Sequence, residues 1–194
     1  MNYHIILASN SPRRRQLLAS LDIPFEVKVL PSVSESYPEG LPPEEIPQHI
    51  ARQKAEAYRQ TMTDDQLVIT ADTVVVSRGK ILGKPADAAQ ARFMLKELSG
   101  HTHHVITGCC LTTLSLQHTF AVTTAVTFKP LTDAEIDYYI DRYKPFDKAG
   151  SYGIQEWIGY IGVTHLNGSY FNVMGLPVQR IYTELKEHFH LQSI

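Results

Sequence analysis

The chain has 194 residues, of which 43% are hydrophobic and 20% are charged. This composition is typical of a globular protein and excludes a disordered or collagen-like chain. The 18 Lys and Arg residues nearly balance the 20 Asp and Glu residues, so the net charge is -2. A chain with this charge has no global field that would attract nucleic acid or an anionic membrane. We therefore expect no nucleic-acid partner and no membrane partner, and any bound anion must be held by a local cluster of cations.

The sequence also indicates a reduced, cytoplasmic protein. No apolar run reaches the 18 residues that a membrane span needs. The first residues are apolar before they are basic, which is the reverse of a secretory signal. The two cysteines, Cys109 and Cys110, are sequence neighbours and make an implausible structural disulfide.

Strand and helix signals alternate along the chain. Apolar runs and alternation predict strands at 3–8, 25–30, 67–76, 81–82, 104–114 and 119–128. Periodicity and end signals predict helices at 12–21, 47–60, 87–98, 132–143 and 178–189. Ser11 precedes a proline at the first helical position, and Thr132 and Glu135 form a capping box.

Asn167-Gly168 predicts a hairpin between strands at 160–166 and 169–173. Helices interleaved with strands, together with antiparallel hairpins, indicate an α/β protein with a mixed sheet. No internal repeat or linker interrupts the chain, so we expect a single domain over residues 1–194.

Three arginines occupy the first turn of the first predicted helix, at 13–15. Cations at a helix N-terminus oppose the helix dipole and cost about 0.3–1 kcal/mol each at the surface. The free backbone N–H groups of that turn already favour an anion, and arginine forks suit phosphate or carboxylate oxygens. The cluster is therefore either a solvated basic face or an anion site. Its place directly after a strand, beside Ser9 and Ser11, favours the anion site.

Asp72 lies within a ten-residue apolar strand, Leu67 to Val76. An unpaired carboxylate buried there would cost several kcal/mol. It needs a metal, a cationic partner or a proton, or else it is a structural residue bonded to backbone N–H groups. We favour a chemical role.

Three further residues are open to two interpretations. Lys54 falls on an apolar helical stripe with Ile50 and Tyr58, where it either snorkels to solvent or serves a site. Lys84 precedes a proline, which holds its backbone extended. Glu35 lies in an acidic stretch, 31–50, that holds five of the eleven prolines and is either mobile surface or a site wall.

Other chemistries find less support. His101, His103 and His104 resemble a zinc cluster, but no complementary Cys or Asp spacing follows. His188 and His190 are interpreted as a polar helix end. No Gly-x-Ser-x-Gly motif occurs and neither cysteine is beside an activating charge, which disfavours nucleophilic serine or cysteine catalysis. The cations and carboxylates instead suit a polyanion bound with metal help, as in phosphoryl chemistry.

Six sequence blocks, in order and spanning nearly the whole chain, resemble the Maf family of nucleoside triphosphate pyrophosphatases. They are 7–18 (LASNSPRRRQLL), 51–55 (ARQKA), 71–75 (ADTVV), 82–85 (LGKP), 148–155 (KAGSYGIQ) and 168–177 (GSYFNVMGLP). The Gly-Ile-Gln ending of the fifth block is similar to the dTTP/UTP branch of the family.

The resemblance implies a fold and an activity. It implies an elongated mixed β-sheet flanked by helices, with two lobes and a central cleft, similar to inosine triphosphatase-like folds. It implies hydrolysis of dTTP and UTP, and of modified pyrimidine nucleotides, to the monophosphate and pyrophosphate. That activity would clean the nucleotide pool with a divalent cation, Mg²⁺ or Mn²⁺, as cofactor. A homodimer is also expected by resemblance.

The resemblance further implies roles for individual residues. Asp72 would accept the proton of the attacking water, and Lys54 and Lys84 would balance charge in the transition state. Glu35 would assist the metal. The substrate would be held by Ser9, Arg13, Arg14, Thr73 and Gln155. An amide at Gln155 can both donate to and accept from the O4/N3–H edge of thymine or uracil.

Three departures from the family pattern stand near these residues. Arg15 follows the usual arginine pair, Gln16 stands where Glu is common, and Ser34 replaces an acidic residue often found before the Glu35 position. Two other functions stay open: a non-catalytic nucleotide-binding regulator of cell division, and a pyrophosphatase for modified purine triphosphates such as 7-methyl-GTP.

Overall fold

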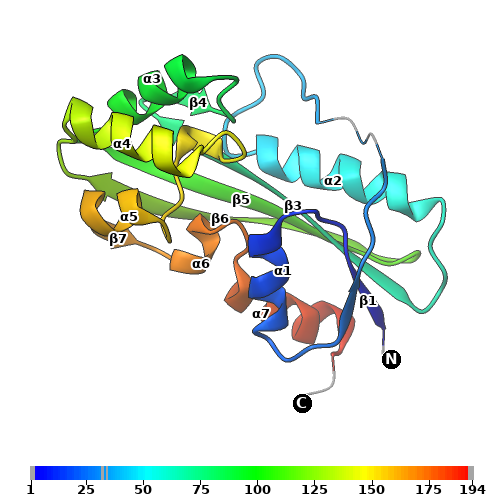
Figure 1. Cartoon of the computed structure of the whole chain (residues 1–194). Coiled ribbons are helices and arrows are strands. Elements are labelled where there is room, and N and C mark those ends of the chain that lie inside the picture. The colour runs from blue at the N-terminus through cyan, green and yellow to red at the C-terminus, as the bar shows by residue number, and fades with distance from the viewer. Residues whose placement is uncertain (1–2, 32, 34, 192–194) are drawn as a thin grey trace. The chain divides into compact units, whose positions relative to one another are not determined.

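The computed structural model describes residues 3–31, 33 and 35–191. In this part of the chain, seven strands form one sheet in the order β2-β1-β3-β5-β6-β7, with β4 paired to β3 (Figure 1). The strands are β1 (His4–Leu7), β2 (Phe25–Val27), β3 (Gln66–Ser77), β4 (Lys80–Leu82), β5 (Thr102–Thr112), β6 (Gln117–Phe128) and β7 (Val163–Asn167). β1 runs parallel to β2 and β3, whereas β4 is antiparallel to β3 and β7 is antiparallel to β6. The predicted mixed sheet is confirmed.

The helices alternate with these strands as the sequence predicts. They are α1 (Pro12–Ala19), α2 (Ile46–Arg59), α3 (Ala88–Leu98), α4 (Asp133–Tyr143), a short 3-10 helix η1 (Ala149–Ser151), α5 (Trp157–Gly162), α6 (Tyr170–Val173) and α7 (Val178–Phe189). The α/β class with helices flanking the sheet is therefore confirmed as well.

The chain divides into two compact units. Unit 1 comprises Met1–Asp72, Thr107–Val122 and Gly175–Ile194, and unit 2 comprises Thr73–Ile106 and Thr123–Met174. The strands β3, β5 and β6 contribute residues to both units. A single domain over residues 1–194 stays a prediction.

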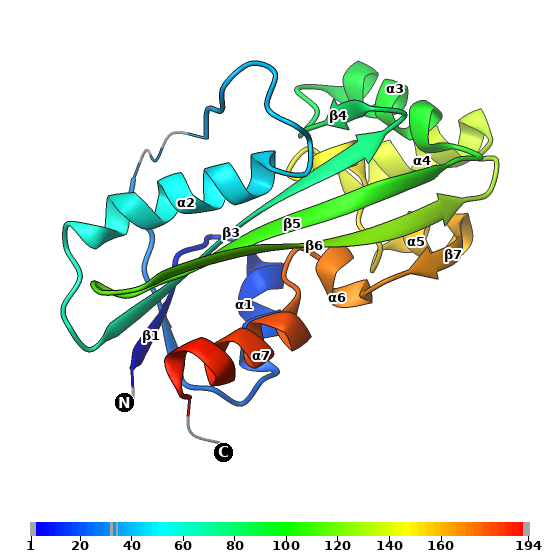
Figure 2. The same ribbon diagram turned by 180° about the vertical axis from the view of Figure 1, so that it is seen from behind.

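In unit 1, helices cover both faces of the sheet. α2 lies on one face, and α1 and α7 lie on the other, as the two opposite views agree (Figures 1 and 2). Strands covered in this way read as continuous apolar runs rather than as alternating ones. The stretch Leu67–Ala71 of β3 is accordingly buried at every position, together with Ile5 and Leu7 of β1.

In unit 2, α3 and α4 lie side by side in both views (Figures 1 and 2). Their apolar stripes pack into one hydrophobic cluster with strand residues and with α5. Leu95, Leu98, Phe128, Tyr139 and Ile158 are among its fully buried members.

Side chains cap the first turns of helices α1, α3 and α4, and two of these caps are predicted from the sequence. The hydroxyl of Ser11 accepts the N–H of Arg14, and the Asp87 carboxylate accepts the N–H of Gln90, so each caps its helix. Thr132 and Glu135 form the reciprocal capping box at the start of α4. Each cap satisfies a backbone donor that the helix itself leaves free.

The hairpin predicted at Asn167-Gly168 is wrong. Residues 157–162 form helix α5, and residues 170–173 form helix α6 rather than a second strand. The Ser169 hydroxyl accepts the N–H of Asn172 and so caps α6. Buried Asn172 then donates to the Val105 carbonyl and the Thr124 hydroxyl. These side-chain bonds outcompete the local turn preference.

Within residues 3–31, 33 and 35–191, no helix has both the length and the apolar character that crossing a bilayer requires.

Candidate active site

The turn from β1 to α1 holds the predicted anion site. The buried hydroxyl of Ser9 accepts the N–H of Ser11 at 3.2 Å, and the Ser11 hydroxyl accepts the N–H of Arg14 at 3.4 Å. Ser9 and Ser11 therefore fix the turn through side chain-to-backbone bonds. Arg13 is half-buried and Arg15 is exposed, so the first turn of α1 presents its cations at different depths.

Two donors of Arg14 are used within unit 1. Its Nε donates to the Gly175 carbonyl and its Nη1 donates to the Ala71 carbonyl, both at 2.8 Å. Burial lowers the pKa of the Arg14 guanidinium, and the nearby Asp72 carboxylate offsets part of that effect. Arg14 thus holds the backbone directly before Asp72. The phosphate contact expected of Arg14 stays a prediction.

Helix α2 packs closely against β5 and β3. A Cβ at Gly108 would lie 2.3 Å from backbone atoms of Pro47 and Gln48, so only glycine allows this approach. The Thr70 hydroxyl donates to the Ala51 carbonyl at 2.7 Å. These contacts fix the position of the helix that carries Lys54.

Tyr58 connects the same helix to the segment that leads into the acidic loop. Its hydroxyl donates to the Lys28 carbonyl at 2.8 Å and accepts the N–H of Leu30 at 2.9 Å. Both bonds lie just before the loop that carries Glu35. The start of that loop is therefore tied to α2.

The ammonium group of Lys54 lies between two carboxylates. Its Nζ is 2.8 Å from Glu35 Oε1 and 3.0 Å from Asp72 Oδ1. The side chains of Lys54 and Asp72 are each 14% exposed, whereas that of Glu35 is 52% exposed. Among the described residues, no partner other than Lys54 bonds to the Asp72 carboxylate. We call Glu35, Lys54 and Asp72 the Lys54 cluster.

The Lys54 cluster shows what three of the predicted site residues contact. Lys54 pairs with carboxylates instead of extending its amine into solvent. Asp72 meets a cation, as a carboxylate in an apolar strand requires. Glu35 pairs with Lys54, and its place in the wall of a site stays a prediction. Ser34, the neighbouring departure from the family pattern, lies outside the described residues.

The remaining predicted residues, Thr73, Lys84 and Gln155, belong to unit 2. Thr73 is half-buried in β3. Lys84 is exposed and precedes a buried proline, and the Gly83 carbonyl before it accepts the N–H of Gly150 at 3.1 Å. Gln155 is half-buried directly before the N-cap of α5. Their catalytic and substrate-binding roles stay predictions.

Lys148 is buried in unit 2 and is not among the predicted site residues. Lys148 Nζ lies 2.8 Å from Asp147 Oδ1 and 3.0 Å from Glu156 Oε1. The other oxygen of Glu156 accepts the Tyr139 hydroxyl, whose oxygen accepts the N–H of Gly153 at 3.0 Å. We call these residues of unit 2 the Lys148 cluster. Its one sequence signal is the position of Lys148 at the start of the block that ends in Gln155.

The cysteines are free and buried. Burial raises the pKa of Cys109 to about 12 and also raises that of Cys110. A thiol with a raised pKa is a poor nucleophile at neutral pH. This agrees with the expectation that neither cysteine is catalytic.

Comparison with known proteins identifies the family. The family model described as Maf-like protein matches residues 4–188. The chain therefore belongs to the Maf family, and the predicted resemblance is confirmed.

Two relatives show the extent of the likeness. A protein from Phocaeicola vulgatus named dTTP/UTP pyrophosphatase is 63% identical over 185 residues, covering 95% of this chain and 96% of its own. A protein of the same name from Parabacteroides distasonis is 59% identical over 187 residues, covering 96% of each chain. A solved structure of a nucleoside-triphosphatase / dITP/XTP pyrophosphatase from Mycobacterium abscessus is similar to 73% of this chain and 95% of its own. That match has 16% identity and a TM-score of 0.42.

Proposed function

We propose that this chain hydrolyses dTTP and UTP to the nucleoside monophosphate and pyrophosphate. The observation that carries the proposal is the 63% identity, over nearly the full length of both chains, to a protein named dTTP/UTP pyrophosphatase. The hydrolase class and the pyrimidine substrates were both expected from the motifs. The Lys54 cluster supplies charged groups of the kind that this reaction needs.

In the proposed reaction, water attacks the α-phosphorus. The new bond joins the water oxygen to phosphorus, the α–β phosphoanhydride bond breaks, and pyrophosphate leaves with the bonding electron pair. Asp72 is proposed to take the proton of the water, because one of its oxygens has no partner within the described chain. Lys54, 3.0 Å from Asp72, would stabilise negative charge that grows in the transition state.

The same cluster fits a divalent metal ion. Glu35 and Asp72 offer carboxylate oxygens, which are the ligands that Mg²⁺ and Mn²⁺ prefer. Glu35 is half exposed, so a solvated ion can reach its carboxylate. Glu35 would hold the ion, which would neutralise charge on the phosphates, and the second oxygen of Asp72 would remain the proton acceptor.

The turn around Ser9 and Arg13 is proposed to bind the phosphates. Backbone N–H groups at a helix N-terminus favour anions, and arginine adds bidentate donors. For Thr73, Lys84 and Gln155, the support for a role is the match to the family's motifs. Gln155 is proposed to contact the pyrimidine edge.

The reaction is tested with purified protein, Mg²⁺ or Mn²⁺, and a panel of nucleoside triphosphates. We expect pyrophosphate from dTTP and UTP and much slower release from CTP, dATP and 7-methyl-GTP. Hydrolysis in ¹⁸O-labelled water should place the label on the monophosphate, since attack is at the α-phosphorus. Orthophosphate as the first product would exclude this reaction, and preference for 7-methyl-GTP would exclude the pyrimidine substrates.

The Asp72→Asn variant separates an enzyme from a regulator that only binds nucleotides. It should lose about 10²–10⁴-fold in kcat, as expected for removal of a positioned base. Asp64→Asn is the matched control, because Asp64 is exposed. If Asp72→Asn keeps full turnover, Asp72 is not the proton acceptor. If the wild-type chain binds dTTP but never turns it over, the regulator replaces the enzyme.

The expected homodimer is also a proposal, and light scattering coupled to size-exclusion chromatography measures it directly. A mass twice that of the chain is the expected result, and a mass equal to one chain would exclude it.

A further inference from the structure

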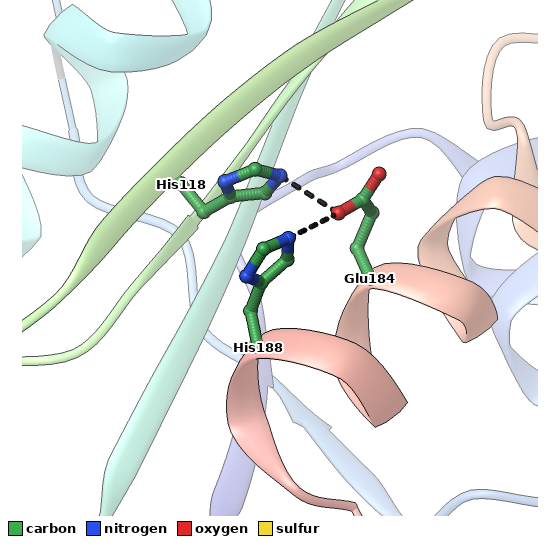
Figure 3. Close-up of side chains that lie close together, drawn as sticks. All are labelled: His118, Glu184 and His188. Carbon is green, nitrogen blue, oxygen red and sulfur yellow. Dashed lines mark ion pairs between the residues drawn. The ribbon is translucent and has the colours of Figure 1, made fainter.

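A cluster of metal-ligand side chains lies in unit 1 and shares no residue with the proposed active site. It consists of His118 on β6 and Glu184 and His188 on α7 (Figure 3). In the described part of the chain, this is the one group of three such residues whose ligand atoms lie close enough for a single ion, all within 4.8 Å of one another. From the sequence alone, His188 is interpreted as part of a polar helix end.

Both imidazoles point at the same carboxylate oxygen. His118 Nε2 is 2.7 Å from Glu184 Oε2, and His188 Nε2 is 3.1 Å from that atom (Figure 3). The two rings are close neighbours, with centroids 4.1 Å apart. If both rings were protonated, two cations would meet at one oxygen. A metal ion instead uses the lone pairs of two neutral imidazoles together with the carboxylate charge.

The contact of His118 with Glu184 does not satisfy hydrogen-bonding geometry. His118 Nε2 is buried and has no hydrogen-bond partner in the described part of the chain, although the carboxylate oxygen is only 2.7 Å away. A buried polar atom without a partner is costly and calls for an explanation. A cation between the three side chains would give this nitrogen a directed bond, which its ion pair with Glu184 does not provide.

The distances are close to those that a bound ion requires. With metal–ligand bonds of about 2.0–2.1 Å, ligand atoms lie about 3.0 Å apart at right angles and about 3.3 Å apart in a tetrahedron. The observed separations from Glu184 Oε2 are 2.7 and 3.1 Å. All three ligand atoms lie within 4.8 Å of one another, and rotations of the side chains would bring them to the spacing that an ion requires.

The residues around the cluster hold the carboxylate in place. Arg180, one turn before Glu184 on α7, pairs with the other carboxylate oxygen, Oε1. The Arg180 guanidinium in turn lies over the ring of Phe120, 5.2 Å from its centroid. Such outer contacts orient ligands in metal sites. Arg180 leaves Glu184 Oε2 directed at the two histidines.

The site is open on one side. The Glu184 side chain is only 4% exposed, whereas that of His188 is 43% exposed. An ion could enter past His188, and a water molecule could complete its coordination. Two nitrogens and one carboxylate oxygen are a ligand set that zinc uses with an open fourth position.

We propose that His118, Glu184 and His188 bind one divalent transition-metal ion of the Zn²⁺ type, which fastens helix α7 to strand β6. Histidine nitrogens select such ions over Mg²⁺, which prefers oxygen ligands. The proposal does not depend on the proposed hydrolysis, since none of its ligands is assigned to that reaction.

The test is calorimetric titration of metal-free protein with Zn²⁺ in millimolar Mg²⁺, which occupies oxygen-rich sites. Wild-type protein should bind one Zn²⁺ with a Kd in the micromolar range or below. His188→Gln and His118→Gln should each weaken binding at least about tenfold, a loss that even outer contacts can cause. His104→Gln is the control, because His104 is exposed and lies outside the cluster. Equal Zn²⁺ affinity in wild type and both cluster variants would overturn the proposal.

Two further measurements test the proposal: the Tm in the presence of Zn²⁺ and the visible absorption of bound Co²⁺. At Zn²⁺ about 100-fold above Kd, the Tm of the wild type should rise by about 5–10 °C, and that of His188→Gln should rise far less. Co²⁺ bound in place of Zn²⁺ should give visible absorption from a site of low coordination number. If Glu35→Gln removes Zn²⁺ binding and His188→Gln does not, the ion binds at the Lys54 cluster and the proposal is wrong.

Discussion

Each of the two units contains one lysine that is nearly buried and lies between two carboxylates. Lys54 in unit 1 meets Glu35 at 2.8 Å and Asp72 at 3.0 Å, and Lys148 in unit 2 meets Asp147 at 2.8 Å and Glu156 at 3.0 Å. In each pair, the carboxylate at the shorter distance is the more exposed one. Distance and burial alone would assign the two clusters the same role.

The two clusters differ in what the deeper carboxylate does with its second oxygen. Glu156 accepts the Tyr139 hydroxyl there, and Tyr139 also accepts the N–H of Gly153. Asp72 has no second partner in the part of the chain that the structure describes. The Lys148 cluster is therefore closed by the protein's own groups, while the Lys54 cluster keeps an acceptor available.

This difference separates a structural ion pair from a candidate catalytic one. A buried network whose members are all bonded makes its segment rigid, and removal of one member leaves an unpaired charge. A carboxylate with a spare oxygen can hold water or a cation and can take up a proton. The same residue types at the same distances thus suit different purposes in the two units.

The largest expected effect is on turnover, in the Lys54→Met variant. This change removes the cation beside Asp72, so kcat for dTTP should fall by about 10²–10³-fold, the usual cost of one lost transition-state contact. Because Asp72 is only 14% exposed and loses its cation, Tm should fall as well, so kcat is measured below that Tm and given per folded molecule. Steady-state kinetics and thermal unfolding on the same preparation measure both quantities. If Lys54→Met lowers Tm strongly and leaves kcat unchanged, Lys54 has a structural role and the distinction between the two clusters is wrong.

The Lys148→Met variant should lose stability without a comparable loss of turnover. Glu156 would lose its cation in a place that water reaches poorly, which should lower the free energy of unfolding by about 3 kcal/mol. Urea unfolding measures the loss. Lys144→Met is the matched control, because Lys144 is exposed and its one ion pair within the described residues, at 3.9 Å, is weak. If Lys148→Met unfolds at the same urea concentration as this control, the Lys148 cluster does not stabilise the fold and its contrast with the Lys54 cluster is wrong.

The fold could largely be predicted from local signals. Apolar runs and end signals identified α7 and the long strands β3, β5 and β6 to within about two residues. The prediction failed between 157 and 173, where two short helices replace a hairpin. There, bonds from Ser169 and Asn172 to partners distant in sequence decide the backbone, and a local turn preference contains no information about them.

The site could be predicted where a residue contradicts its surroundings. Asp72 in an apolar strand and Lys54 on an apolar stripe both stand out, and the structure pairs them. Glu35 had no such signal, since a carboxylate in a polar loop is ordinary. The cluster of His118, Glu184 and His188 is only partly visible in the sequence. Glu184 and His188 are four residues apart and so share a face of α7, but nothing in the sequence shows that His118 of β6 lies beside them.

A substitution at Gly108 tests whether the position of helix α2 controls the function of Lys54. In Gly108→Ala, the new Cβ would meet the backbone of Pro47 and Gln48 at 2.3 Å, so α2 must shift. We expect a loss of about 2–3 kcal/mol in unfolding free energy, as for other overpacked sites. Because α2 carries Lys54, kcat should fall as well.

Gly150→Ala is the counterpart in unit 2. Gly150 has a φ of +67°, and its Cβ would lie 3.0 Å from Val75. Urea unfolding and kinetics on both variants make the comparison. Gly150→Ala should lose stability with a smaller effect on kcat per folded molecule. If the two variants lower kcat equally, the segment that carries the Lys148 cluster also influences turnover.

The smallest expected effect concerns His103, a buried residue of unit 2 whose Nε2 contacts the Tyr152 hydroxyl at 2.7 Å. Burial, together with the charge of His104, lowers the pKa of His103 to about 3. The unfolded chain, with an ordinary pKa near 6.5, therefore binds a proton between pH 6.5 and 3 that the folded chain does not. Stability contributed by neutral His103 is complete above pH 6.5 and is lost as the pH falls towards 3, by about 1.4 kcal/mol per pH unit.

Between pH 7 and pH 5, this loss amounts to about 2 kcal/mol, and it should be absent in His103→Gln, which has no group that titrates. Urea unfolding of wild type and variant at both pH values isolates the effect, since other histidines contribute equally to both proteins. The pKa values of Asp65 and Glu135 are lowered in the folded chain, so these carboxylates affect stability only at more acidic pH. A parallel loss of stability in wild type and variant would show that His103 takes up its proton in the folded protein. The aromatic packing of His103 against Tyr152 and Phe128 would then have to tolerate a cation.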